Sequence, residues 1–227
     1  MSEFPVRVIG HRGVVGSEPE NTLRSFVRAE TVGADEIELD IRVSADGHLV
    51  VVHDATVDRT TSGTGEVAGL TLAELRALDA GLGEHVPTYE EVLAAVALPI
   101  QTEIKVLSAV RPFAELVRRL GVAERVTAAS HSAEIVAAVR DELPEVPRTL
   151  ILPRSPADSV DQARAVGATW LALGLADLTE ALVDKVHDAG IRIDAWPVGD
   201  ADRLARAVSL GVYSVTTDHA DQIRTWL

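Results

Sequence analysis

The sequence of 227 residues contains no cysteine and few positive charges. Without cysteine the protein can form neither a disulfide nor a thiolate metal site, and its redox compartment cannot be inferred. Its 21 Lys and Arg residues face 35 Asp and Glu residues, so the formal net charge is −14. This charge argues against nucleic acid and anionic membranes as partners. A small phosphate-bearing ligand remains compatible with it, because a local cluster of cations or a bound metal can reverse the field inside a cleft.

Long hydrophobic runs are also missing. No stretch is both apolar enough and long enough to span a bilayer, so we expect no stable membrane insertion. The first seven residues show no long apolar core and no cleavage site, so we expect no signal peptide and a cytoplasmic protein. Apolar residues make up 47% of the chain, which provides for a sizeable core in one large domain or two small ones. The oligomeric state is unknown at this stage.

Short β-branched runs alternate with amphipathic runs that end in glycine, the usual stop signal just past a helix. The predicted strands cover residues 6–10, 36–43, 99–106, 126–130, 148–152, 169–173, 191–198 and 212–217. The predicted helices cover residues 21–32, 110–120, 133–143, 158–166, 178–189, 202–210 and 221–227. This rhythm predicts an α/β protein with the (β/α)8 TIM barrel fold, formed as a single domain by residues 1–227. The alternative, an open doubly wound sheet, is disfavoured because no glycine-rich phosphate turn follows the first strand.

One segment breaks the rhythm. Residues 46–98, between the second and third predicted barrel strands, are too many for a single helix. They contain two helix starts with capping-box spacing, Thr71 to Glu74 and Thr88 to Glu91. We therefore expect a short insertion after the second strand, over about residues 54–87.

The segment opens with Asp46-Gly47, which is a strong hairpin signal. A two-residue turn there pairs Ala45 with His48 and, if continued, sets His53 opposite Asp40. The third barrel strand competes for the same edge, so this register can end before Asp40. In either case the return strand brings His53 towards the barrel mouth.

Polar residues stand two apart on two of the predicted strands: Glu38 and Asp40 on one, Glu103 and Lys105 on the next. This spacing points both side chains of a pair to the same face of a strand. In a barrel these strand ends meet at one mouth, where three carboxylates face a single lysine. A hard divalent cation would offset the surplus charge, and oxygen ligands favour Mg²⁺ or Ca²⁺ over zinc, with Mn²⁺ as a third candidate. The alternative is a set of buried ion pairs that plugs the barrel.

Two histidines accompany these carboxylates. His11 directly follows the first predicted strand, and His53 arrives with the hairpin, so we expect both to transfer protons. Arg12 and Lys105 provide fixed positive charge for phosphate oxygens. His131 and Trp196, at two other strand ends, are candidates for substrate contact at the mouth, away from the carboxylates. Plain core packing is the alternative for Trp196.

The chain resembles the glycerophosphodiester phosphodiesterase family. The motifs that carry the resemblance are His11-Arg12-Gly13, Pro19-Glu20-Asn21-Thr22, Gly33-Ala34-Asp35, Ile37-Glu38, Asp40, Asp46-Gly47, Val52-His53-Asp54, Arg59-Thr60-Thr61, Gly63, Pro87-Thr88, Glu103-Ile104-Lys105 and Thr217-Asp218. The resemblance implies a (β/α)8 barrel in which Glu38, Asp40 and Glu103 bind the metal. It also implies that His11 and His53 are the acid/base pair and that Arg12 and Lys105 bind phosphate.

The implied activity is metal-dependent hydrolysis of a small-molecule glycerophosphodiester to glycerol 3-phosphate and an alcohol. The resemblance suggests that the glycerol hydroxyl of the substrate attacks first and forms a cyclic phosphate. Two alternatives remain, a phosphodiesterase of lysophospholipase D type and a non-catalytic barrel that binds a phosphodiester. The chain departs from the family pattern in its short insertion, in Ser130-His131 where Ser-Phe is usual, and in Trp196-Pro197-Val198-Gly199 where Trp-Thr-Val-Asn is usual. These departures concern the pocket wall.

Overall fold

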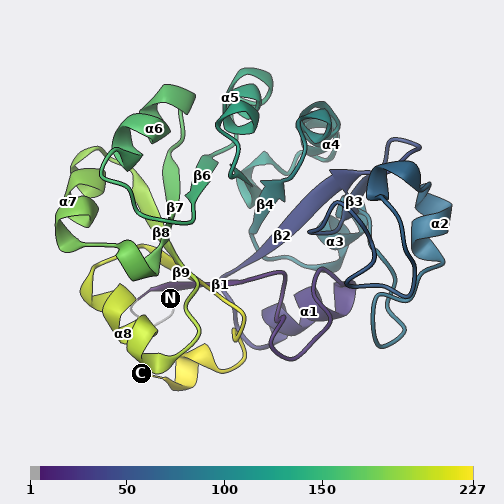
Figure 1. Cartoon of the computed structure of the whole chain (residues 1–227), viewed down its shortest axis with the longest axis horizontal. Coiled ribbons are helices and arrows are strands. Elements are labelled where there is room, and N and C mark those ends of the chain that lie inside the picture. The colour runs from purple at the N-terminus through teal and green to yellow at the C-terminus, as the bar shows by residue number, and fades with distance from the viewer. Residues whose placement is uncertain (1–5, 227) are drawn as a thin grey trace.

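A computed structural model describes residues 6–226 of the chain. Within them, eight parallel strands close into a barrel surrounded by helices, as predicted (Figure 1). The strands are β1 (Arg7–Gly10), β2 (Glu36–Val43), β4 (Ile100–Ile104), β5 (Val126–Ser130), β6 (Arg148–Leu152), β7 (Trp170–Gly174), β8 (Arg192–Trp196) and β9 (Ser214–Thr217). They run in the order β1-β9-β8-β7-β6-β5-β4-β2, and pairing between β1 and β2 closes the ring.

Six helices flank the barrel strands: α1 (Leu23–Thr31), α4 (Val110–Leu120), α5 (Ala133–Glu142), α6 (Ser159–Val166), α7 (Glu180–Asp188) and α8 (Ala201–Ser209). Their apolar faces pack on the outer side of the strands, where Phe26 and Phe113 are fully buried. The N-terminus of α1 is capped by Thr22, whose hydroxyl accepts from the Ser25 amide. Gly121 ends α4 in the left-handed conformation, with a φ of 66°. Of the helix predicted over 221–227, the described residues form only the 3₁₀ turn Ile223–Thr225.

The segment between β2 and β4 contains β3 (Leu49–Val51) and α2 (Leu72–Arg76), which lie to one side of the barrel ring (Figure 1). It ends with α3 (Tyr89–Ala95), which follows the predicted insertion and packs on the barrel, since Tyr89, Val92 and Leu93 belong to the main hydrophobic core. Both predicted capping boxes are present, at Thr71 and at Thr88. The insertion has a small hydrophobic cluster of its own, formed by Val50, Val52, Val57, Val67, Leu75, Ala80 and Val86. Val50 and Val52 of the return strand belong to this cluster, whereas Leu49 and Val51 belong to the main core.

No helix among residues 6–226 is long and apolar enough to cross a membrane.

The predicted hairpin register is wrong by one residue. β3 pairs with β2 through Ile41 and Val51, and the Val52 amide donates to the Asp40 carbonyl at 3.0 Å, so Val52 stands where His53 was expected. The loop between Ser44 and His48 has three residues and ends at Gly47, whose φ is +87°. A glycine in this left-handed conformation after a tight turn is the common three-residue hairpin, which shifts the register relative to a two-residue turn.

Candidate active site

The predicted site residues gather at the carboxyl ends of the barrel strands, around a cavity of about 130 Å³. The cavity is lined by His11, Arg12, Glu38, His53, Gln101, Glu103, His131, Ile151, Ala172, Asp194, Trp196 and Thr216. The two remaining predicted residues, Asp40 and Lys105, contact Glu103 or its partners directly beside the cavity. All nine predicted residues therefore belong to one mouth.

Glu38, Asp40 and Glu103 form a compact carboxylate cluster. The parallel register of β2 and β4 sets Asp40 beside Glu103, and Glu38 lies two residues earlier on the same face of β2. One oxygen from each side chain lies within 4.8 Å of the other two, and all three residues are buried. Burial, followed by the charge of Asp40, raises the pKa of Glu38 above its ordinary value.

Two cations compensate part of this charge. Lys105 Nζ lies 2.9 Å from Asp40 Oδ1 and 2.7 Å from Glu103 Oε1, and Arg12 Nε lies 3.3 Å from Asp40 Oδ2. Burial opposes ionisation of Asp40, but Lys105 and Arg12 lower its pKa below the ordinary value. Glu38 instead accepts from the Arg12 backbone amide at 3.0 Å. Three buried oxygen donors with excess negative charge fit a hard divalent cation.

Each of the two histidines is oriented by an aspartate. His11 Nδ1 lies 2.5 Å from Asp218 Oδ1, and its Nε2 lies 4.0 Å from Glu38 Oε2. His53 Nδ1 lies 2.6 Å from Asp54 Oδ1. Burial alone would lower the pKa of His11, but Asp218 and Glu38 raise it above the ordinary value. Because each ring uses Nδ1 for a carboxylate, the opposite nitrogen is left for a ligand.

The opposite wall of the cavity comes from β6 to β9 and is largely apolar. Ile151 and Ala172 form a small buried cluster inside the barrel, and Trp196 packs against it. The ring centroids of His131 and Trp196 lie 6.0 Å apart, with an edge-to-face orientation. His131 Nε2 also lies 3.8 Å from Glu103 Oε1. The expectation that His131 stands away from the carboxylates is therefore wrong, because β5 neighbours β4 and its end lies beside Glu103.

Comparisons with known proteins agree with this geometry. The family model for the glycerophosphoryl diester phosphodiesterase family matches residues 11–222. The chain belongs to this family. A glycerophosphodiester phosphodiesterase from Caldanaerobacter subterraneus subsp. tengcongensis is 32% identical over 231 residues, which are 95% of each chain. A crystal structure of the Agrobacterium tumefaciens str. C58 glycerophosphodiester phosphodiesterase is 29% identical, with a TM-score of 0.85 over 97% of this chain and 99% of that one.

A third relative shares the fold. The Oleispira antarctica phosphodiesterase in complex with sn-glycerol-3-phosphate has a TM-score of 0.89 and 23% identity, over 97% of this chain and 96% of that one. Because the identity is low, this likeness concerns the barrel architecture alone. Family membership rests on the sequence match, which spans all the strands that carry the candidate residues.

The sequence analysis assigned no role to Arg59, which the structure places in an ion network behind the site. Arg59 Nη1 and Nη2 lie 2.7 and 2.9 Å from the two carboxylate oxygens of Glu20, and its Nε lies 2.7 Å from Asp54 Oδ2. Glu20 in turn accepts from Arg12 Nη1 at 2.8 Å, while Asp54 holds His53. Arg59 thus connects Arg12 with His53 through Glu20 and Asp54. The signal was its place in a family motif, since periodicity does not reveal an ion network between two loops.

Asn21 is a second missed residue. Its Nδ2 donates to Asp40 Oδ2 at 2.8 Å, from a backbone with a φ of 57°. Asparagine tolerates this left-handed conformation better than most residues. Asn21 therefore holds one carboxylate oxygen of Asp40, Oδ2, while Lys105 contacts the other oxygen, Oδ1.

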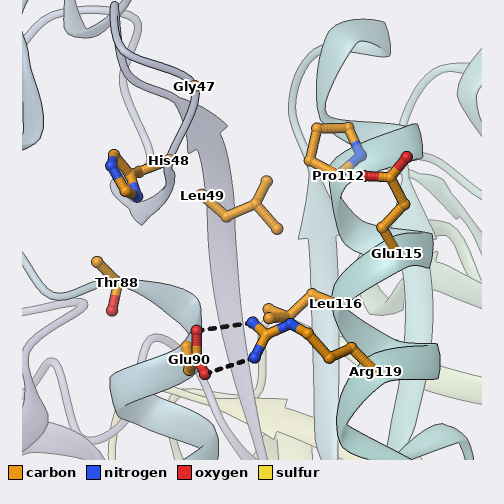
Figure 2. A pocket seen from close by; sticks show the side chains of 9 residues that line it. All are labelled: Gly47, His48, Leu49, Thr88, Glu90, Pro112, Glu115, Leu116 and Arg119. Atoms are coloured by element: carbon orange, nitrogen blue, oxygen red, sulfur yellow. Dashed lines mark hydrogen bonds and ion pairs between the residues drawn. The ribbon is translucent and has the colours of Figure 1, made fainter.

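A larger hollow of about 340 Å³ lies outside the barrel, between the hairpin tip, α3 and α4 (Figure 2). It is lined by Gly47, His48, Leu49, Thr88, Glu90, Pro112, Glu115, Leu116 and Arg119. Glu90 pairs with Arg119 at 2.9 and 3.1 Å (Figure 2). Glu115 pairs with Arg111 at 2.9 Å. Because its charged groups neutralise each other or a neighbour, this hollow is a weaker candidate for phosphate chemistry than the barrel mouth.

Proposed function

We propose that this protein is a metal-dependent glycerophosphodiester phosphodiesterase that releases glycerol 3-phosphate and an alcohol. The observation that carries the proposal is the combination, around one cavity, of three buried carboxylates and two histidines that are each held by an aspartate. Membership of the family supports the reaction class. The 32% identical relative from Caldanaerobacter subterraneus, which is named a glycerophosphodiester phosphodiesterase, supports the substrate class.

The metal ligands in this proposal are Glu38, Asp40 and Glu103, which would hold one divalent cation. Their oxygen donors favour Mg²⁺ or Ca²⁺, with Mn²⁺ as a third candidate. A bound cation of this kind supplies positive charge to phosphate oxygens and activates an oxygen nucleophile. Lys105 and Arg12 already stand at the rim of the cluster, so they can neutralise further phosphate oxygens.

The two histidines would divide the proton transfers. One accepts the proton of the attacking oxygen, which belongs either to water or to the neighbouring glycerol hydroxyl, and the other protonates the departing alkoxide. Attack by the glycerol hydroxyl gives a cyclic phosphate, which a water molecule then opens to glycerol 3-phosphate. Asp218 and Asp54 hold the two rings by Nδ1, so that Nε2 of each ring can face the substrate. His131 and Trp196 would contact the substrate on the wall side. Asp194 and Thr216 interrupt the apolar lining of this wall, so it is a poor channel for an acyl chain.

The test is a substrate panel with Mg²⁺, Ca²⁺ or Mn²⁺, in which release of glycerol 3-phosphate is measured from glycerophosphocholine, glycerophosphoethanolamine and glycerophosphoglycerol. Lysophosphatidylcholine is included as the competing substrate. We expect turnover of at least one glycerophosphodiester. Preference for lysophosphatidylcholine would indicate the lysophospholipase D type. Binding without turnover of any diester would indicate a non-catalytic barrel.

A further inference from the structure

Asp194 is a buried carboxylic acid that the proposed chemistry does not use. It lies on β8, is only 1% exposed, and lines the cavity at the barrel mouth. Its Oδ1 accepts from Ser214 Oγ at 3.0 Å and its Oδ2 accepts from Thr216 Oγ1 at 2.8 Å. Within residues 6–226 its hydrogen-bond partners are thus two hydroxyl groups, without the cation that buried carboxylates usually require. Burial raises the pKa of Asp194 to about 7.

The position of Asp194 defines a closed end of the cavity. It precedes Trp196 by two residues on the inner face of β8 and lies beside Ala172 in the parallel register. Asp194, Ala172 and Thr216 are between 1 and 6% exposed. By contrast, the side chains of His53 and His131 are 34 and 43% exposed. The cavity therefore has a closed floor, to which β7, β8 and β9 contribute Ala172, Asp194 and Thr216, and an open rim at the histidines.

This shape separates the two substituents of a phosphodiester. With the phosphate at the carboxylate cluster, one substituent faces the closed floor and the other faces the open rim. The glycerol part is constant in the proposed substrate class, whereas the alcohol varies. A closed floor in a cavity of about 130 Å³ suits the small constant part, and the open rim suits the variable one.

We propose that Asp194, with Thr216, binds the terminal hydroxyl of the substrate's glycerol and so selects for glycerol-bearing diesters. This inference rests on the proposed function. Each carboxylate oxygen has two acceptor sites, and one of each is used by Ser214 or Thr216. The remaining sites can accept the hydroxyl proton, while Thr216 Oγ1, which donates to Asp194, still offers a lone pair.

The experiment compares two substrates that differ only in that hydroxyl. One is a glycerophosphodiester and the other is the matched diester of propane-1,2-diol, which keeps the hydroxyl next to the phosphate and lacks the terminal one. The wild type, Asp194→Asn, Thr216→Val and the control Thr149→Val are assayed for kcat/KM on both. Thr149 is fully buried on β6, two residues before Ile151, and is a matched change inside the barrel but outside the cavity lining.

The wild type should prefer the glycerol substrate by roughly 10- to 100-fold, the range expected when a hydrogen bond to a charged group is lost. Asp194→Asn should reduce this preference by about 10-fold, because the amide lacks the charge that strengthens the bond. The isosteric Thr216→Val should also reduce the preference for the glycerol substrate. If Asp194→Asn fails to fold, Thr216→Val provides the test in its place. The preference of Thr149→Val should equal that of the wild type.

Three results would overturn the inference. One is an equal loss on both substrates in Asp194→Asn and Thr216→Val, which indicates a purely structural role. Another is a change, in Asp194→Asn or Thr216→Val, in the relative kcat/KM for glycerophosphocholine and glycerophosphoglycerol. Such a change would place the departing alcohol at the floor. If the wild type hydrolyses neither substrate, the proposed function fails, and calorimetry with glycerol 3-phosphate and propane-1,2-diol phosphate tests the floor by itself. Equal Kd values for these two ligands would then overturn it.

Discussion

Two buried carboxylates at the barrel mouth, Asp40 and Asp194, are stabilised in opposite ways. In the sector formed by β1, β2 and β4, Asp40 contacts Lys105, Arg12 and Asn21, which lower its pKa in spite of burial. In the wall formed by β6 to β9, Asp194 has only hydroxyl partners among its described hydrogen bonds, and burial raises its pKa to about 7. Asp40 thus stays charged beside its cations, as the proposed metal and phosphate binding requires, whereas Asp194 is suited to neutral polar groups. Glu38 lies in the same half as Asp40, but burial raises its pKa.

The largest effect is expected in the charged sector. Glu103→Gln removes one of three carboxylate donors, so affinity for the divalent cation should fall by roughly 100-fold or more, beyond the loss typical of residues that only support metal ligands. Calorimetry with Mg²⁺, Ca²⁺ and Mn²⁺ measures this change. Excess chelator should abolish activity of the wild type. The exposed Glu115→Gln on α4 is the control. Full activity in excess EDTA, with no metal found by elemental analysis, would refute the metal site.

The next effect concerns the histidines of the same sector. His11→Ala and His53→Ala should each lower kcat by roughly 100-fold or more, the scale expected for general acid–base groups. Metal affinity should be retained, because neither histidine belongs to the carboxylate cluster. Steady-state kinetics at saturating metal provides the measurement. A His53→Ala variant with near wild-type kcat would remove His53 from the mechanism.

A smaller loss is expected when the ion network behind the sector is broken. Arg59→Ala releases both Glu20 and Asp54, so Arg12 and His53 lose their orientation. We expect kcat/KM to fall by about 10-fold, in line with the loss of supporting interactions. Arg59→Lys should retain only part of the kcat/KM that Arg59→Ala loses, because an ammonium group cannot make the same bidentate contacts. Arg111→Ala, which breaks an exposed helix pair, is the control and should retain full activity. Equal activities of Arg59→Ala and wild type would show that the network is dispensable.

His131 tests the border between the two halves, since it approaches both Glu103 and Trp196. His131→Phe should change the relative kcat/KM among choline, ethanolamine and glycerol diesters by at most tens of fold, because one contact contributes about 1–3 kcal/mol. Metal affinity should remain unchanged. If all three substrates lose the same factor, His131 supports the chemistry or the fold, and its place in the pocket wall is incorrect.

The sequence predicted the charged sector better than the wall. Side chains two residues apart on a strand point to the same face, and the conformation of the loops does not change this. The proximity of Glu38, Asp40 and Glu103 could therefore be predicted from their spacing and from the order of the strands. The hairpin register was missed because loops of two and three residues share the same Asp-Gly signal, and the choice depends on the conformation of Gly47. The network of Arg59 depends on two loops meeting in space, which periodicity does not encode.

Asp194 was missed for a different reason. In the run from Arg192 to Trp196 it looks like one polar residue in a buried strand. Its inward orientation follows from alternation with Trp196, so the signal was present in the sequence. What the sequence could not supply was its neighbour across the sheet, because the pairing of Asp194 with Ser214 depends on the register between β8 and β9. Whether Asp194 lines a cavity depends on how all the barrel strands are arranged, which the sequence of one strand does not reveal.

The last expected effect concerns the stability of the fold and not the activity, and it tests the contrast between Asp40 and Asp194. Burial raises the pKa of Asp194 from 3.8 to about 7, so the folded protein binds this proton more tightly than the unfolded chain does. The resulting stabilisation is fully present below about pH 4 and is lost as pH rises through about 7. Asp194→Asn stays neutral throughout.

The free energy of unfolding of Asp194→Asn, relative to wild type, should therefore increase between pH 5 and pH 8 by roughly 1–3 kcal/mol. Urea denaturation at the two pH values measures this difference. Thr149→Val, which removes a buried hydroxyl but no titrating group, should differ from wild type by the same amount at both pH values. A difference for Asp194→Asn that does not change with pH would mean that its carboxyl group titrates alike in the folded and unfolded states. The wall would then hold a solvated or compensated charge, and the contrast with Asp40 would disappear.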